Sequence, residues 1–341
     1  MKKEVEVVDP VVQRTWREVS ESGAGQLAAS YVLTTAIVGL TRAGVADRLS
    51  SSWTPLQALV PPGGRADRVG QVLRYLEIRE VVESGADGWR LTARGERLFG
   101  EVAESLLGYY VDAYGPVLHR IGDLLDGSAR YDVDVRRDTE QLGLRCEVLF
   151  RSFGADLVRN LAAEYGSRGV LDLGCGTGGL LLDLVTADPD LTGVGLDIAA
   201  DAIALAATRA EAAGVTDRLR FVQGDAFAPH TWPAEVDRCD LYVAVGALHE
   251  HFRDGDQAVV DLLSTYADRL REGRKLLLCE PELHVDAADA DFYLVHVLTE
   301  QGFPQPRARW QEVIAAAGLT CERIFSAPNT GFRFAYYEIT G

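Results

Sequence analysis

The chain has 341 residues, 47% of them hydrophobic, which is enough for two domains with sizeable cores. Its formal net charge of -17 argues against a nucleic-acid partner, because phosphate contacts need clustered lysines and arginines, and it favours a small-molecule substrate. The five scattered cysteines lack C-x-x-C spacing, which is typical of free thiols in a reducing compartment. With no secretory h-region and no apolar segment long enough to span a bilayer, the sequence predicts a cytoplasmic protein without a membrane partner.

The first hundred residues predict helices followed by a small hairpin. The segment 27–40 is apolar on more than one helical face, which is typical of a helix buried against a neighbour. A helix over 65–78 and two short strands within 81–92 complete a winged-helix arrangement. In DNA-binding proteins with this arrangement the second helix enters the major groove, but here that helix, 65–78, carries Asp67 and Glu77 among its arginines. DNA binding is therefore disfavoured.

Residues 101–164 predict a helical connector, with a turn-rich stretch at 127–136, that we expect to line the substrate pocket. From residue 165 to 341, strand-length apolar runs alternate with alanine-rich helices, which predicts an α/β, Rossmann-like domain with a mostly parallel sheet. The last two strands, near 321–326 and 332–339, are joined by a turn at 328–331. We expect this C-terminal hairpin to give one antiparallel edge strand.

A glycine-rich turn follows the first strand of this domain and predicts a nucleotide-like cofactor site. Its glycines let the backbone approach a ligand closely. A carboxylate about twenty residues later is placed to accept hydrogen bonds from ribose hydroxyls, and an acid after the third strand is placed for an adenine amino group. The predicted cofactor residues are Asp172, Gly174, Gly176, Gly178, Asp197, Ile198, Asp225, Ala226 and Phe227.

These three spaced elements resemble the class I S-adenosylmethionine-dependent methyltransferases over about residues 165 to 341. The turn is G-x-G-x-G preceded by Asp172, and the resemblance implies that this acid pairs with the amino group of S-adenosylmethionine. The region 1–100 looks like the dimerisation module of the small-molecule O-methyltransferases. That likeness implies a winged-helix dimerisation domain and a homodimer.

Two histidines mark the expected substrate pocket. His249, with Glu250, follows the fourth strand, where ligands bind in open α/β sheets, and His296 lies in an apolar helix after the fifth strand. One interpretation is an O-methyltransferase with His249 as the general base, which leaves His296 without a role. The other is a transition-metal site between the two imidazoles, with iron favoured and zinc or another metal as alternatives.

The residue pattern behind the second interpretation resembles that of the metal-dependent phenylpyruvate and other 2-oxo-acid C-methyltransferases of antibiotic pathways. The likeness is carried by His249 with Glu250, by His296 followed eight residues later by Pro304, and by Arg137. It implies that Arg137 binds the substrate carboxylate, that His249 and His296 hold the metal, and that the β-carbon is methylated through a metal-stabilised enolate. The family has an aspartate where this chain has Glu250, so the base that removes the β-proton stays open between Glu250 and a metal-bound hydroxide.

Overall fold

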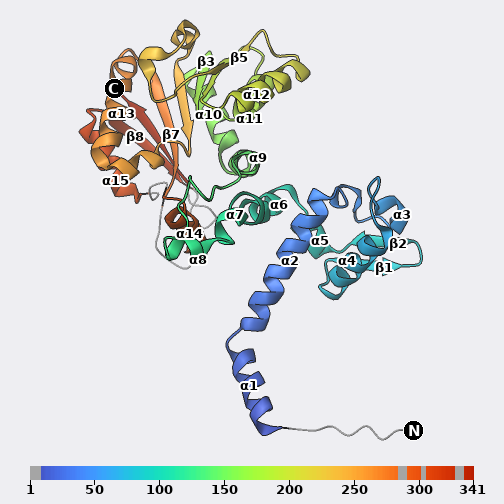
Figure 1. The fold of residues 1–341 in the computed structure, drawn as a ribbon. Helices are drawn as coiled ribbons and strands as arrows, with labels where there is room; N and C mark the ends of the chain where they lie inside the picture. Colours follow the sequence, from blue (N-terminus) through green and yellow to red (C-terminus); the bar gives the residue numbers. More distant parts are fainter. Residues whose placement is uncertain (1–8, 283–289, 301–304, 327–333) are drawn as a thin grey trace, which may run out of the picture. The chain divides into compact units, whose positions relative to one another are not determined.

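The structure is a computed structural model that describes residues 9–282, 290–300, 305–326 and 334–341. The chain divides into two compact units, residues 1–112 and 113–341, and each is described by itself (Figure 1). The boundary falls inside the predicted connector. Pro304 and the turn at 328–331 lie outside the described residues.

The first unit is mainly helical and contains the predicted two-stranded wing. Asp9 caps α1 by accepting from the N–H groups of Val11 and Val12. An apolar core, which includes Leu33, Leu59 and Leu73, joins the helix that contains Leu33 to the two-stranded wing. The elements are α1 (Pro10–Glu21), α2 (Ala24–Arg42), α3 (Leu56–Leu59), α4 (Ala66–Ile78), β1 (Val82–Gly85), β2 (Gly88–Leu91), α5 (Ala93–Leu98) and α6 (Glu101–Gly108).

Helix α2 is longer than the apolar segment seen in the sequence. Its 19 residues meet the length and composition expected of a membrane-crossing helix, yet a core or interface helix meets the same test. Only its second half packs into the unit, whereas Leu27 and Tyr31 in the first half are exposed. Val12 and Trp16 of α1 are exposed as well, and we call these four apolar side chains the α1–α2 surface.

The second unit is built on a seven-stranded sheet in the order β5-β4-β3-β6-β7-β9-β8. The first five of these strands are parallel, as predicted, and β9 is antiparallel to both of its neighbours. The strands are β3 (Gly169–Leu173), β4 (Thr192–Asp197), β5 (Leu219–Gln223), β6 (Leu241–Val245), β7 (Lys275–Pro281), β8 (Thr320–Ser326) and β9 (Phe334–Thr340).

The expectation of an antiparallel edge strand needs a correction. The reversed strand β9 lies one position in from the edge, and the edge strand is β8. Burial explains the order, because the central five residues of β9 are buried while β8 has no buried residue. The more apolar strand takes the interior position and the polar one faces solvent.

Helices cover both faces of the sheet, as parallel strands require. In Figure 1, α13 (Asp256–Arg271) and α15 (Arg307–Ala316) lie on one side, and α10 (Asp156–Tyr165), α11 (Gly179–Ala187) and α12 (Ala200–Ala212) lie on the other. Each face has its own apolar core, so the sheet is fixed from both sides.

A short helical layer precedes the sheet domain and supplies part of the candidate site. It contains α7 (Gly115–Leu118), α8 (Ile121–Leu125) and α9 (Thr139–Phe150). Helix α14 (Ala290–Leu298), which follows β7, packs against α7, and its Leu298 shares a small core with Val117 and Val135. This packing brings the segment just before α9 next to α14.

Candidate functional site

The predicted glycine turn has the expected conformation. Gly174, Gly176 and Gly178 all have positive φ, at 80°, 51° and 79°, in the left-handed region that favours glycine. A Cβ at Gly176 would meet nothing within 4 Å, whereas one at Gly178 would lie 2.5 Å from Phe221. Gly178 is therefore required for packing, and Gly176 leaves open space where a ligand can approach the backbone.

Two carboxylates flank this turn. Asp197, at the end of β4, accepts from the N–H of Gly176 and the N–H of Ala199, both at 2.8 Å, and so holds the turn against β4. Asp172 is buried in β3, and within the described residues no donor or cation contacts its carboxylate. Burial and then the charge of Asp197 raise the pKa of Asp172 to about 7. A buried acid without a partner fits an incoming ammonium group.

The segment after β5 is held by aromatic side chains. Trp232 donates to the carbonyl of Asp225 at 2.9 Å, and Tyr266 donates to the carbonyl of Ala226 at 2.8 Å. The ring of Phe227 makes an edge contact with His251, their centroids 4.4 Å apart. Ile198 is 74% exposed at the same end of the sheet, where an apolar ring could cover it. The predicted cofactor residues thus come together at the carboxyl ends of β3, β4 and β5.

A network that the sequence did not reveal fixes the turn from the other side. Glu147 of α9 accepts from both terminal nitrogens of Arg209 at 2.7 Å and also receives the hydroxyl of Thr177. A Cβ at Gly179 would lie 2.3 Å from the Glu147 carboxyl carbon, so glycine is needed there. One carboxylate therefore joins α9, the glycine turn and α12.

His249 is oriented by a fully buried carboxylate, Glu280 of β7. Its Nδ1 lies 2.8 Å from Glu280 Oε2, and the other oxygen accepts from the N–H groups of Ala247 and Leu248. A carboxylate in this setting accepts, so the Nδ1 atom of His249 carries the hydrogen and Nε2 has a free lone pair. Sequence reasoning missed Glu280, although an acid inside the apolar run of β7 was the signal for it.

His296 has its ring hydrogen on the same nitrogen, Nδ1, as His249. Its Nδ1 lies 2.8 Å from the carbonyl of Phe292, which can only accept, so its Nε2 is also bare. Burial, followed by the nearby His249 and Arg137, lowers the pKa of His296 to about 3, and the imidazole stays neutral. The ring centroids of His249 and His296 are 5.8 Å apart. The structure therefore brings together the two histidines that the sequence paired.

Arg137, just before α9, joins the same cluster. Its Nη2 donates to Glu250 Oε1 at 3.2 Å, and its Nη1 donates to Tyr114 Oη at 3.4 Å. Burial would lower the pKa of Arg137, but Tyr114 and Glu250 outweigh it and hold the pKa above its usual value. The site therefore contains a charged, mostly buried guanidinium beside two imidazoles, of which His296 is neutral.

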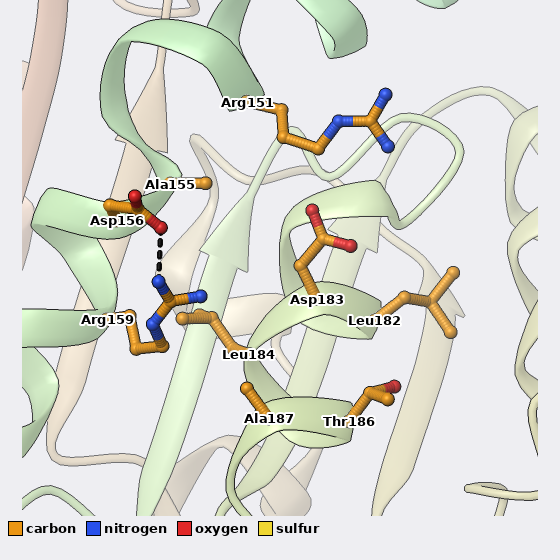
Figure 2. A pocket seen from close by; sticks show the side chains of 9 residues that line it. All are labelled: Arg151, Ala155, Asp156, Arg159, Leu182, Asp183, Leu184, Thr186 and Ala187. Carbon is orange, nitrogen blue, oxygen red and sulfur yellow. Dashed lines mark hydrogen bonds and ion pairs between the residues drawn. The ribbon is translucent and has the colours of Figure 1, made fainter.

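Two further observations concern metal-holding groups and a pocket outside the site. Within the described ranges, no group of three or more His, Cys, Asp or Glu side chains is arranged to hold a metal ion. A surface pocket of about 370 Å³ lies between α10 and α11 and is lined by Arg151, Arg159 and Asp183, among others (Figure 2). It contains none of the predicted site residues and is separate from the cluster around His249.

The chain is similar to known methyltransferases in sequence and in fold. Residues 170–273 match the methyltransferase domain family. The chain is 28% identical to the 2-ketoarginine methyltransferase of Streptomyces arginensis over 84% of its own length and 85% of that protein.

Two solved structures share the fold over nearly the whole chain. Mitomycin 7-O-methyltransferase is 18% identical, with a TM-score of 0.67 and coverage of 96% of this chain and 99% of that one. Human N-acetylserotonin methyltransferase is 14% identical, with a TM-score of 0.70 and coverage of 98% and 99%. At these identities the likeness shows the fold alone.

Proposed function

This chain is a class I S-adenosylmethionine-dependent methyltransferase with an O-methyltransferase-like fold, and we propose that it methylates the β-carbon of a 2-oxo acid. The observation that carries the proposal is the pair of imidazoles, His249 and His296, whose ring centroids lie 5.8 Å apart beside the buried guanidinium of Arg137. A metal-binding pair next to a carboxylate-binding group suits a substrate that presents a keto oxygen and a carboxylate together. The likeness to a 2-ketoarginine methyltransferase supports the same substrate class.

The two histidines fit a single transition-metal ion, with iron favoured and zinc as an alternative. Each Nδ1 is occupied by an acceptor, so each Nε2 is free to be a ligand. The two Nε2 atoms are therefore the atoms that would hold the ion. Two protein ligands leave positions open for a chelating substrate. When bound, the ion would act as a Lewis acid that stabilises the negative charge of an enolate.

The chain's own residues supply orientation and proton transfer. Arg137 binds the substrate carboxylate through charge-assisted hydrogen bonds, while its burial excludes water from the contact. Glu250, next to His249 in sequence, is the carboxylate available to take the β-proton. Asp172 and Asp197 would hold the methyl donor at the carboxyl ends of the strands, and holding the reacting carbons together would supply much of the rate.

An O-methyltransferase of a phenol or hydroxyl is the second candidate. One observation favours it: Glu280 fixes the tautomer and the orientation of His249, as a general base requires. This candidate leaves the buried, neutral His296 without a role.

Hydrogen exchange separates the two candidates. The C-methyltransferase should exchange the β-protons of phenylpyruvate with heavy water faster than the uncatalysed reaction, and a chelator should remove this acceleration without weakening S-adenosylmethionine binding. Elemental analysis of the purified protein should find about one equivalent of a transition metal. A metal-free protein that methylates at full rate would exclude the proposal.

The α1–α2 surface supports a homodimer, which we also propose. Trp16 and Leu27 are 67% and 72% exposed, and large apolar side chains exposed to this extent on neighbouring helices favour contact with a partner. Light scattering should give a dimer for the full chain and a monomer when Trp16 and Leu27 are changed to serine. Leu205→Ser, at an exposed apolar position on α12, is the matched control and should stay dimeric. A monomeric wild-type protein would contradict the proposal.

A further inference from the structure

The ion pair between Arg137 and Glu250 raises a question that the proposed reaction leaves open. Arg137 is the group proposed to bind the substrate carboxylate, but in the free protein it already has a carboxylate partner. Glu250 Oε1 lies 3.2 Å from its Nη2, and the two side chains are 18% and 33% exposed for Arg137 and Glu250. A substrate carboxylate that binds this edge of the guanidinium would compete with Glu250 for the hydrogens of Nη2.

The pair has a physical reason in the free protein. A guanidinium buried to this extent needs a counter-charge, because an unpaired buried charge costs several kcal/mol. Tyr114 Oη, 3.4 Å from Nη1, provides a polar contact but no formal charge. Glu250 therefore keeps Arg137 extended toward the histidines before any substrate arrives.

Glu250 also has a second cation within reach. Its Oε2 lies 3.9 Å from Nη2 of Arg253, a half-exposed residue on the same short helix, η6 (His249–Asp254). A small rotation of the Glu250 side chain would exchange one guanidinium for the other. Displacement from Arg137 would therefore not leave the Glu250 charge unpaired.

We propose that Glu250 is an internal stand-in for the substrate carboxylate, which binds Arg137 in the free enzyme and is displaced to the Arg253 side by the incoming acid. This inference rests on the proposed function and makes Glu250 a specificity-determining residue. A ligand that binds Arg137 must displace the carboxylate of Glu250. A substrate without a carboxylate cannot do so, and the ion pair between Arg137 and Glu250 stays in place. The same competition weakens the affinity for the correct acid.

A simpler effect must be separated from this one, because the removal of any nearby negative charge favours anion binding. Asp254 provides the matched control. It lies on the same helix and its side chain is exposed. Within the described residues it makes no contact with Arg137. Asp254→Asn and Glu250→Gln remove the same charge, but only the second removes the carboxylate that contacts Nη2 of Arg137.

The test is calorimetric titration of phenylpyruvate and of its methyl ester into protein saturated with S-adenosylhomocysteine, so that no turnover occurs. Glu250→Gln should tighten phenylpyruvate binding about fivefold, the range of a partly exposed ion pair, and should leave ester binding unchanged. Asp254→Asn should change phenylpyruvate affinity by less than about twofold. In an Arg137→Gln background, the gain from Glu250→Gln should disappear.

Several results would overturn the inference: no tightening, equal tightening with Asp254→Asn, equal tightening for the ester, or no phenylpyruvate binding by any variant. Methylation of phenylpyruvate by the wild-type protein, assayed with S-adenosylmethionine in place of S-adenosylhomocysteine, distinguishes this inference from the proposed function. The predicted binding pattern without methylation would support the stand-in and remove the reaction. Methylation without tightening would do the reverse.

Discussion

The cofactor half and the substrate half of the site are built in different ways. The cofactor half consists of backbone turns and acids at the ends of the neighbouring strands β3, β4 and β5, within about fifty residues of sequence. The substrate half consists of single side chains from the segment before α9, the loop after β6, the strand β7 and the helix α14. Local sequence therefore defines the first half, whereas tertiary packing assembles the second.

This difference predicts how each half responds to mutation. The cofactor half should retain its affinity when the substrate half is damaged, because its contacts with the cofactor are its own. The substrate half should respond to residues that touch neither substrate nor metal, because its side chains depend on positioning partners such as Glu280.

The largest expected effect comes from the two histidines. His249→Ala and His296→Ala should each lower the rate of methylation by at least about a hundredfold, because one imidazole alone would hold a metal poorly. S-adenosylmethionine affinity should stay within about twofold of wild type. The exposed His230→Ala is the control and should retain activity. Full activity in His296→Ala would favour the O-methyltransferase candidate instead.

Glu280→Gln should have the next largest effect, a loss of about ten- to a hundredfold in kcat. The amide of glutamine can keep a carbonyl oxygen on the backbone N–H groups of Ala247 and Leu248, but its NH₂ would then face Nδ1 of His249. That contact favours the other tautomer and puts the hydrogen on Nε2. Metal content measured together with kcat tests this, since both should fall. An unchanged metal content would show that Glu280 does not set the tautomer.

Asp197→Ala should weaken S-adenosylmethionine binding about tenfold or more, because a charged acceptor for the ribose is lost and the turn at Gly176 loses its anchor. Affinity for phenylpyruvate should be nearly unchanged if the two halves are separate. Asp201→Ala, an exposed acid in the first turn of α12, is the control. Unchanged cofactor affinity in Asp197→Ala would mean that the ribose binds elsewhere.

Protonation of Asp172 in the wild-type protein should give the smallest of these effects near neutral pH and a larger one in acid. Its carboxyl has a pKa of about 7 in the free protein, so it is increasingly neutral as the pH falls below 7. Pairing with the ammonium of the cofactor needs the carboxylate, so affinity should fall by up to about tenfold for each pH unit below 7 and should level off above it. Isothermal titration at several pH values checks this, and Asp172→Asn should bind weakly at every pH. A flat profile for the wild type would contradict the assignment.

The same contrast explains what the sequence could predict. The parallel strands, the glycine turn and the acids at the ends of β4 and β5 were predictable because periodicity and short spacing encode them. The interior place of β9 was not, because strand order depends on which strand packs better after the chain has folded. The link from Glu147 to Arg209 was also hidden, because sixty-two residues separate its two ends.

The pairing of His249 with His296 was predicted from the positions of the two residues after neighbouring strands and from a family likeness. The sequence places both residues near the carboxyl end of the sheet, but it does not encode the separation of their rings. The structure adds that separation, and it adds the acceptors Glu280 and the Phe292 carbonyl that set both tautomers. These acceptors lie on a neighbouring strand and on the helix backbone, so no linear motif contains them.

The most direct test of the central claim is the position of the transferred methyl group. The metal-loaded protein would be incubated with phenylpyruvate and S-adenosylmethionine carrying a ¹³C-labelled methyl group, and the product examined by carbon–proton correlation NMR. The account predicts a methyl carbon bonded to the β-carbon, with its protons coupled to a single β-proton, and no such product in the presence of a chelator. A labelled methyl group bonded to oxygen, or a product that forms equally well without metal, would contradict it.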